Sequence, residues 1–163
     1  MSTAVGPVKR VTLWVRDIEA SLALYRDLLG LSVVEDKRLE AAAVRALLGV
    51  EAGRLRIVHL GAGEDPHGWV GLYALADARP APPSLPVPDR TRFSYGQAVV
   101  VFETRRLDEL RISLATHGYR MLGPAIDYFK NEGSPQSPAG RYREVVFFDP
   151  DDIPISIIQF DPA

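Results

Sequence analysis

The feature that most constrains the fold is a pattern that occurs twice, once on each side of a proline-rich stretch. Residues 77–94 hold five prolines and show neither helical nor strand periodicity, which is typical of an extended linker. The flanking segments are similar to each other in pattern, and such a repeat predicts two copies of one structural unit. We therefore predict a single domain over 1–163, made of a first module at 8–76 and a second module at 95–163.

The first segment predicts a strand, a helix and three further strands. Residues 11–15 are β-branched and strand-like, and Asp17 fits the residue that caps a helix start. Apolar residues then follow at spacings of four, three and four, which places them on one helix face: Ile18, Leu22, Tyr25 and Leu29. Gly30 fits a left-handed helix end. Further strands are predicted at 31–35, 54–60 and 69–75, with a short helical turn at 41–48.

The second segment repeats this order. A strand at 98–102 precedes Thr104, a helix cap candidate, and Gly118 fits the helix end. The helix stripe is Leu107, Leu110 and Leu114. Strands are predicted at 119–122, 143–148 and 154–160, and a Gly/Pro/Ser-rich loop at 131–140. Each module therefore predicts a βαβββ unit of the α+β class. Two such sheets, each with a helix on its back, can form a shared open bowl lined by alternate strand residues.

Composition excludes several functions. The chain has no cysteine, so disulfides, thiolate catalysis and Cys-based zinc sites are excluded. Its formal net charge of -2 shows no basic footprint of a nucleic-acid binder, and no apolar run is long enough to span a bilayer. The first residues lack the pattern of a signal peptide, which favours a cytoplasmic location.

Two stretches of this sequence resemble a known family. Residues 11–31 resemble the opening strand and helix of the vicinal oxygen chelate superfamily, which includes glyoxalases, bleomycin resistance proteins and extradiol dioxygenases. Residues 148–159 resemble its closing hairpin with an Asp-Pro turn. The resemblance covers nearly the whole chain apart from the proline-rich linker. It implies the two-module fold, with a divalent metal held inside the bowl.

The family's metal ligands come from the first and last strands of each module, and the matching positions here are Arg10, Gly71, Val99 and Ser156. Arginine stays protonated and has no lone pair to donate, glycine and valine offer no donor atom, and a neutral serine is a poor ligand. A register shifted by two residues would replace Val99 by Gln97, and the metal site would still have no second ligand. The three histidines do not match these positions: His59, His67 and His117. We therefore predict no metal and no other cofactor.

Alternation from Arg10 predicts an aromatic, largely apolar lining with a few polar groups. Such a lining suits a flat or amphipathic small molecule as ligand. The predicted ligand-binding residues are Arg10, Thr12, Trp14, Trp69, Tyr73, Val99, Val101, Tyr128, Glu144, Phe148 and Ser156. Alternation adds Gly71, Glu103, Val146 and Ile158 to the same lining.

Several of these residues have two readings. Arg10 can anchor a carboxylate or phenolate, or it can pair with Glu144 or Glu103. Trp14 and Trp69 can stack on a ligand or fill core. Glu144 can be a general base or part of a rim salt bridge.

Two interpretations also apply to the segment before the 131–140 loop. Tyr128, with its neighbours Asp127 and Lys130, can form a lid over the bowl, or the three can belong to a plain surface loop.

The leading functional hypothesis is a protein that binds or sequesters a small molecule in a metal-free bowl. The alternative is a metal-independent lyase or isomerase that uses Arg10 with Glu144 or Glu103 as catalytic residues. The missing ligands argue against a third hypothesis, a metal-dependent glyoxalase or dioxygenase, and the apolar bowl argues weakly against a structural or regulatory module. Whether the chain is an enzyme stays open, and a homodimer is compatible with the pattern but not required by it.

Overall fold

The computed structural model describes residues 4–49, 51, 53–78, 86, 95–135 and 137–162. The chain divides into two compact units, Met1–Pro86 and Val87–Ala163. We describe these units, the first and the second module, each by itself. Most of the predicted linker 77–94 lies outside the described residues, and the bowl shared by the two modules stays a prediction.

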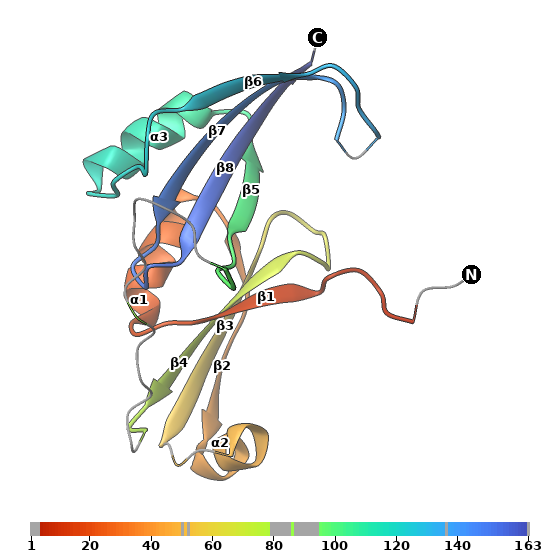
Figure 1. The fold of residues 1–163 in the computed structure, drawn as a ribbon. Coiled ribbons are helices and arrows are strands. Elements are labelled where there is room, and N and C mark those ends of the chain that lie inside the picture. The colour runs from red at the N-terminus through yellow and green to blue at the C-terminus, as the bar shows by residue number, and fades with distance from the viewer. Residues whose placement is uncertain are drawn as a thin grey trace. The chain divides into compact units, whose positions relative to one another are not determined.

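The first module has one four-stranded sheet and three helical elements, of which the first two follow each other without a break (Figure 1). Its elements are β1 (Arg10–Trp14), α1 (Ile18–Leu22), the π-helical turn η1 (Ala23–Leu28), β2 (Ser32–Glu40), α2 (Ala41–Leu48), β3 (Arg54–Gly61) and β4 (Trp69–Ala76). The strand order is β1-β4-β3-β2. Strand β1 pairs parallel with β4, and the other neighbours are antiparallel.

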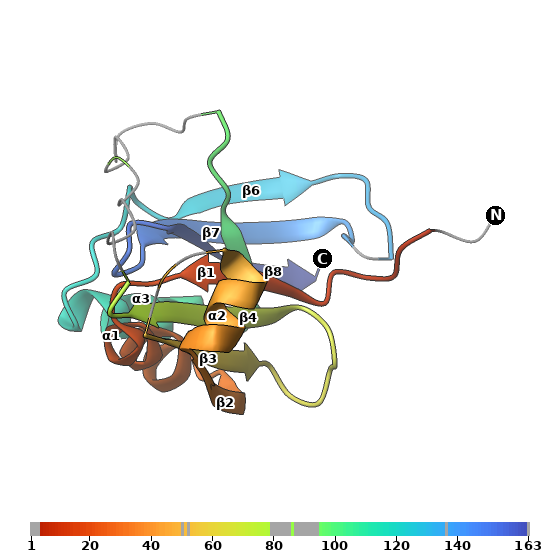
Figure 2. The ribbon, with the colours of Figure 1, turned by 90° about the horizontal axis from the view of Figure 1, so that it is seen from below.

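The second module repeats this topology. Its elements are β5 (Val100–Thr104), α3 (Leu107–Thr116), β6 (Ile126–Lys130), β7 (Gly140–Phe148) and β8 (Pro154–Pro162). The strand order β5-β8-β7-β6 again pairs the first strand parallel with the last, and β6 forms one edge of the sheet (Figure 2). The predicted α+β class and the βαβββ order are therefore confirmed.

The first helix begins as predicted and then widens. The side chain of Asp17 accepts hydrogen bonds from the backbone N–H groups of Glu19 and Ala20, at 2.8 and 3.3 Å. From residue 23 the helix changes to π-type turns, in which the N–H of Leu29 bonds the carbonyl of Leu24. The wider turn shifts the buried face, because Leu24 is fully buried and Leu29 only half-buried. The predicted stripe was wrong at Leu29 for this reason.

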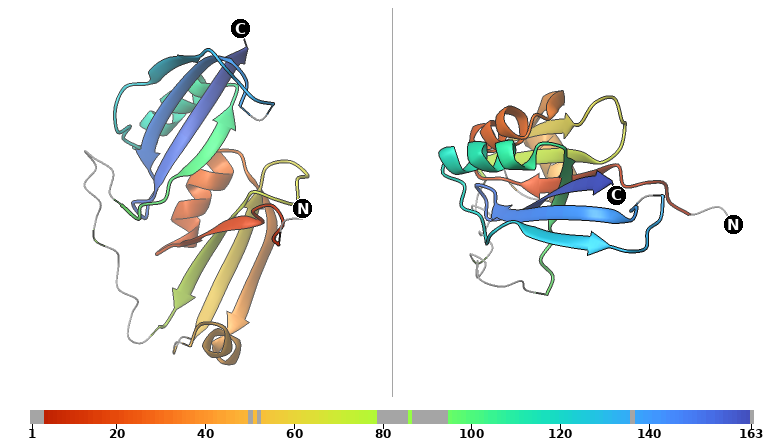
Figure 3. Two further views of the ribbon diagram at one scale, coloured as in Figure 1. Left: turned by 45° about the vertical axis from the view of Figure 1, so that its right-hand side comes forward. Right: turned by 90° about the horizontal axis from the view of Figure 1, so that it is seen from above.

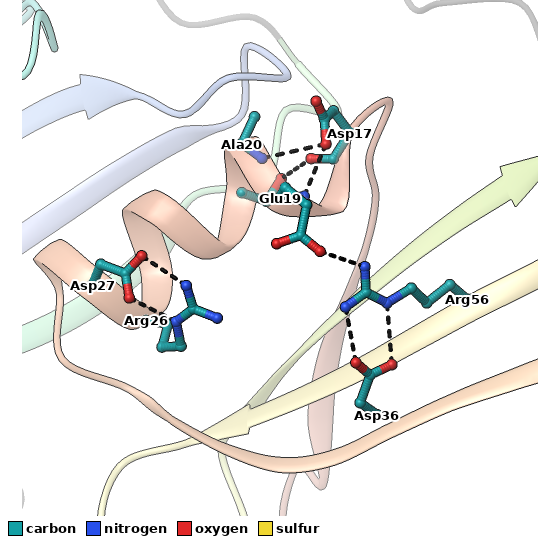
Figure 4. Close-up of polar contacts among 8 residues, drawn as sticks. Asp17, Glu19, Ala20, Arg26, Asp27, Asp36 and Arg56 are labelled. Atoms are coloured by element: carbon teal, nitrogen blue, oxygen red, sulfur yellow. Dashed lines mark hydrogen bonds and ion pairs between the residues drawn. The ribbon is translucent and has the colours of Figure 1, made fainter.

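An ion-pair cluster fastens α1 to its sheet (Figure 4). Arg56 of β3 donates to both carboxylate oxygens of Asp36 on β2, at 3.1 and 2.8 Å. Its third nitrogen donates to Glu19 at 2.6 Å. This guanidinium lowers the pKa of Asp36, chiefly through its hydrogen bonds. The bidentate geometry and the half-buried Arg56 make this pair more than a loose surface contact.

The helix α3 is held in a similar way along one face of the second sheet (Figure 3). Arg143 of β7 donates to both oxygens of Asp108, at 2.9 and 2.7 Å. The N–H of Leu107 donates to the side chain of Gln159 at 2.9 Å. Thr104 accepts a hydrogen bond from the N–H of Arg106 but does not cap the helix itself, because Arg106 occupies the cap position and the helix begins at Leu107, two residues later than a cap at Thr104 requires.

Each module has a core between its helix and the near face of its sheet. Alternation places the buried residues Leu13, Val58, Leu60, Val70 and Leu72 on the near face of the first sheet. The buried residues Val145, Phe147, Ile155 and Ile157 occupy the same face of the second sheet. We call the opposite faces, away from α1 and α3, the first and the second front face.

One predicted strand was wrong. Residues 119–122 form no strand, and only Met121 makes an isolated bridge, to Phe147. Gly123 and Pro124 interrupt the run, and pairing with β7 starts after them, as β6. Asp127, Tyr128 and Lys130 therefore belong to a strand, so neither a loop lid nor a plain surface loop describes them.

Helix α2 covers one end of the first front face, near the end of β2 (Figure 1). Its Val44 packs in a buried cluster with Leu55, Ile57 and Tyr73. Within the described part of the chain, no helix is long and apolar enough to cross a membrane.

Candidate functional site

The first front face carries five of the polar and aromatic residues that the sequence predicted as lining. Strand pairing places Thr12, Gly71, His59 and Glu35 in one row across β1, β4, β3 and β2. The neighbouring row is Trp14, Tyr73, Ile57 and Lys37, and Arg10 pairs with Trp69 beside them. Arg10, Thr12, Trp14, Trp69 and Tyr73 therefore share one face of one sheet.

A buried histidine lies at the centre of this face. His59 is 4 % exposed, and its Nδ1 lies 2.8 Å from Oε2 of Glu35. Its Nε2 lies 3.3 Å from the hydroxyl oxygen of Tyr73. Because a carboxylate only accepts, Nδ1 carries the proton of a neutral imidazole, and Nε2 then accepts from Tyr73. The three side chains form one chain of hydrogen bonds from Glu35 to Tyr73.

The charges around His59 favour its neutral form. Burial lowers the pKa of His59, and the positive charge of Arg10 lowers that pKa further, against the opposing effect of Glu35. Lys37 donates to both oxygens of Glu35, at 3.1 and 3.0 Å, and this contact is the main cause of the lowered pKa of Glu35. The result is an ionised Glu35 beside a neutral imidazole at neutral pH.

Aromatic rings surround this polar cluster. The rings of Trp14 and Tyr73 meet edge to face, with centroids 5.5 Å apart, and the ring of Trp69 lies 6.0 Å from that of His59. The indole N–H of Trp69 donates to the carbonyl of Asp65 at 2.9 Å, which fixes that ring. Trp14 is 48 % exposed and so has ring surface available to a ligand.

Gly71 occupies the position of a family metal ligand, but its surroundings leave little space for a ligand side chain. A Cβ at this position would lie 3.1 Å from Cε1 of Tyr73, 3.4 Å from Cδ2 of His59 and 3.5 Å from Cδ of Arg10. A longer ligand side chain would need these neighbours to move. Gly71 instead brings the three side chains of Arg10, His59 and Tyr73 around one point.

The second front face is more apolar. Pairing aligns Val101, Ser156 and Val146 in one row, and Glu103, Ile158 and Glu144 in the next. The Ser156 hydroxyl donates to Oε1 of Glu144 at 2.5 Å.

A row of aromatic rings crosses the same face. Tyr128 stacks on Tyr142, with centroids 5.4 Å apart and an angle of 9° between the planes. Tyr142 in turn contacts Phe160 at 5.0 Å. Burial, and after it the negative charge of Glu144, raise the pKa of Tyr128.

The remaining predicted residues lie at the ends of strands. Val99 comes just before β5, and Phe148 ends β7, where it is buried. Arg10 lies in the first module, and Glu144 and Glu103 lie in the second. Either pairing of Arg10 with a carboxylate therefore stays a prediction.

Sequence reasoning missed His59 and Glu35. His59 lies within the strand predicted at 54–60, and alternation along it would have placed His59 with the front-face residues. The search for metal ligands considered only the first and last strands of each module. The Glu35 partner could not be found, because a bulge between Val33 and Glu35 shifts the pairing of β2.

The residues of this protein do not fit the metal site that the fold implies. None of the side chains of Arg10, Gly71, Val99 and Ser156 is a normal ligand of a divalent metal. Among the described residues, no three His, Asp or Glu side chains form a group that could hold a metal ion. No chemical step is therefore assigned to a metal here.

The family model for the glyoxalase/bleomycin resistance protein/dioxygenase superfamily matches residues 8–157. The chain belongs to this superfamily. A search of the curated proteins found no match.

Solved structures of the superfamily fold are similar to this chain. A glyoxalase family protein from Bacillus cereus shows 18 % sequence identity and a TM-score of 0.72, over 97 % of this chain and 96 % of that one. TnmS3, an antibiotic binding protein from Streptomyces sp. CB03234, shows 16 % identity and a TM-score of 0.55, over 98 % and 100 %. At such identities the likeness concerns the fold alone.

Proposed function

We propose that this superfamily member binds a small aromatic or amphipathic molecule on its first front face without the help of a metal. One observation carries the proposal. Both tryptophans of the chain and Arg10 lie on one sheet face, around a buried polar cluster whose hydrogen bonds are satisfied. Ring surface beside the positive charge of Arg10 suits a flat molecule with an anionic group.

The superfamily gives this proposal context. TnmS3, which has a similar fold, is an antibiotic binding protein, so this fold is compatible with the binding of a small molecule. The stacked rings of Tyr128 and Tyr142 on the second front face offer a further apolar surface for a ligand.

A metal-independent lyase or isomerase, with Arg10 and either Glu144 or Glu103, is the second candidate. The hydrogen bond from Ser156 supports it, because this bond fixes the orientation of the Glu144 side chain, as a general base requires. A cytoplasmic location and a homodimer also stay predictions.

A thermal-shift panel of aromatic acids, quinones and hydrophobic antibiotics, run with and without EDTA, tests the binding function. We expect at least one compound to raise the melting temperature equally in both series, and to be recovered unchanged. A stabilising effect that EDTA abolishes would contradict the proposal. Turnover that is lost in Glu144→Gln, but kept in EDTA, would favour the second candidate.

Intrinsic fluorescence then locates the ligand. Both tryptophans lie on the first front face, so a ligand bound there changes their emission. We expect Trp14→Ala to weaken binding about tenfold, as for the loss of one aromatic stacking contact. Phe129→Ala is the matched control, because Phe129 is an exposed aromatic residue on β6 that points away from the second front face. Equal effects of both substitutions would exclude the first front face.

A further inference from the structure

We propose that the first front face takes a flat weak acid whose acidic group is a hydroxyl on an sp² carbon, a phenol or an enol, and binds it as the anion. In this account Arg10 faces the negative charge, and the hydrogen-bonded chain Tyr73–His59–Glu35 receives the proton. The inference rests on the proposed function, since it specifies the ligand class of the same face. It assigns a role to His59 and Glu35, which the family's ligand positions leave out.

The geometry supplies a complete route for a proton. The hydroxyl of Tyr73 lies 3.3 Å from Nε2 of His59, and Nδ1 of His59 lies 2.8 Å from Glu35. Enzymes activate a hydroxyl group with the same arrangement, in which a carboxylate orients an imidazole and the imidazole accepts the hydroxyl proton. Here the terminal hydroxyl belongs to Tyr73, which is 8 % exposed and whose ring meets the more exposed ring of Trp14 edge to face.

The proton transfer balances within this set of residues. The O–H bond of the ligand breaks, and its electron pair stays on the ligand oxygen. The oxygen of Tyr73 takes that proton and passes its own to Nε2 of His59, so Tyr73 ends unchanged. His59 becomes an imidazolium, with the ionised Glu35 at Nδ1 as its counter-charge.

Arg10 couples the anion to this transfer. In the free protein, burial, the charge of Arg10 and, after it, the charge of Lys37 lower the pKa of His59, and Glu35 acts against them. A bound anion offsets the charge of Arg10, and this change raises the pKa of His59. Arg10 and His59 approach the same point above Gly71, where a Cβ would lie 3.5 and 3.4 Å from their carbons. Anion binding and protonation of His59 therefore favour each other.

The probe is 4-nitrophenol, because its phenolate absorbs at a longer wavelength than its phenol. Absorbance gives the phenolate fraction of the bound probe, and tryptophan quenching independently gives the amount bound. The measurement is made at a pH below the pKa of free 4-nitrophenol. We expect the phenolate-to-phenol ratio of the bound probe to be about tenfold higher than that of the free probe, which corresponds to a pKa lowered by one unit. EDTA is present throughout.

Two variants break the route, and one serves as control. Tyr73→Phe removes only a hydroxyl and keeps the ring, and His59→Gln removes the proton acceptor. For both we expect a bound ratio within about twofold of the free probe. His67→Gln replaces an exposed histidine in the turn before β4 and should match the wild type.

Each outcome decides the inference. Saturable quenching without the absorbance shift in the wild type would overturn the inference and leave the proposed binding function standing. No saturable binding of 4-nitrophenol would also overturn it, while the thermal-shift panel separately decides the proposed function. A full shift that survives in both Tyr73→Phe and His59→Gln would show that the proton goes elsewhere.

Discussion

The two modules share a backbone plan and differ in what they place on it. In both, an arginine of the third strand holds the second residue of the helix: Arg56 with Glu19, and Arg143 with Asp108. Aligned on the family's ligand positions, Arg10 and Gly71 correspond to Val99 and Ser156. The next residue across the sheet from Gly71 is His59, and from Ser156 it is Val146.

This comparison separates stability from function. The near faces of the two sheets are both apolar and buried against a helix. The front faces differ, because the first carries a buried histidine with a charged partner and the second a serine–glutamate pair beside stacked tyrosines. The two modules therefore have similar cores but carry different polar groups on their front faces. Single substitutions test the cores and the front faces separately.

The largest effect is expected in the two cores. Leu72 and Ile157 occupy corresponding positions on β4 and β8 and are almost fully buried. Leu72→Ala and Ile157→Ala should each lower the free energy of unfolding by about 2–5 kcal/mol, since each leaves a cavity. Urea denaturation measures both. A loss below about 1 kcal/mol in one of them would show that this module does not depend on its near face.

A smaller effect is expected at the serine–glutamate pair. Ser156→Ala removes the hydroxyl that donates to Glu144, and the loss should cost about 1–2 kcal/mol in urea denaturation. Glu144→Gln is the matched variant, because its amide oxygen still accepts from Ser156, and it should cost less. The reverse order would mean that the charge of Glu144, and not this bond, matters for stability.

A smaller difference in stability is expected between substitutions at the starts of helices α1 and α3. Asp17 caps α1 with two hydrogen bonds, whereas α3 has no side-chain cap. Asp17→Ala should cost about 1 kcal/mol, and Thr104→Ala should cost clearly less. Thermal unfolding of the two variants under one condition measures the difference. Equal losses would contradict the assigned caps.

The smallest effect is a pH dependence from His59. Its pKa in the folded protein is lowered below the ordinary value of 6.5. As the pH falls below 6.5, the unfolded chain binds a proton that the folded protein resists, so stability is lost from there down to the folded pKa. Well above pH 6.5, His59 is neutral in both the folded and the unfolded chain, so it contributes nothing to the slope of stability against pH.

His59→Gln should remove this slope, and His67→Gln should keep it. Urea midpoints measured from pH 7 downward test the expectation in about half-unit steps. The carboxyl groups with lowered pKa, such as Glu35 with its ordinary value of 4.5, lose their contribution only at lower pH. An unchanged slope between wild type and His59→Gln would show that burial of His59 costs little.

Local patterns predicted most of the fold. The cap at Asp17, the left-handed Gly30 and the short helix at 41–48 were all read from residue chemistry and periodicity. The π-type turns of η1 and the bulge in β2 were not, because both depend on tertiary packing. Strand β6 was missed for a related reason, since its pairing with β7 is long-range.

The candidate site was predicted only in part. Alternation from Arg10 placed the residues of β1 and β4 on one face, because period-two geometry is local. The His59–Glu35 contact joins β3 to β2 through the shifted register, which no local pattern encodes. The metal question, in contrast, depends on the identity of four residues and could be addressed from the sequence.

A crystal structure of the EDTA-treated protein, grown with the most stabilising compound of the panel, would show where the ligand binds. We expect the compound to lie against Trp14 and Trp69, with its anionic group near Arg10 and Tyr73. A transition-metal ion coordinated by protein side chains, or the compound bound away from the first front face, would contradict the proposed function.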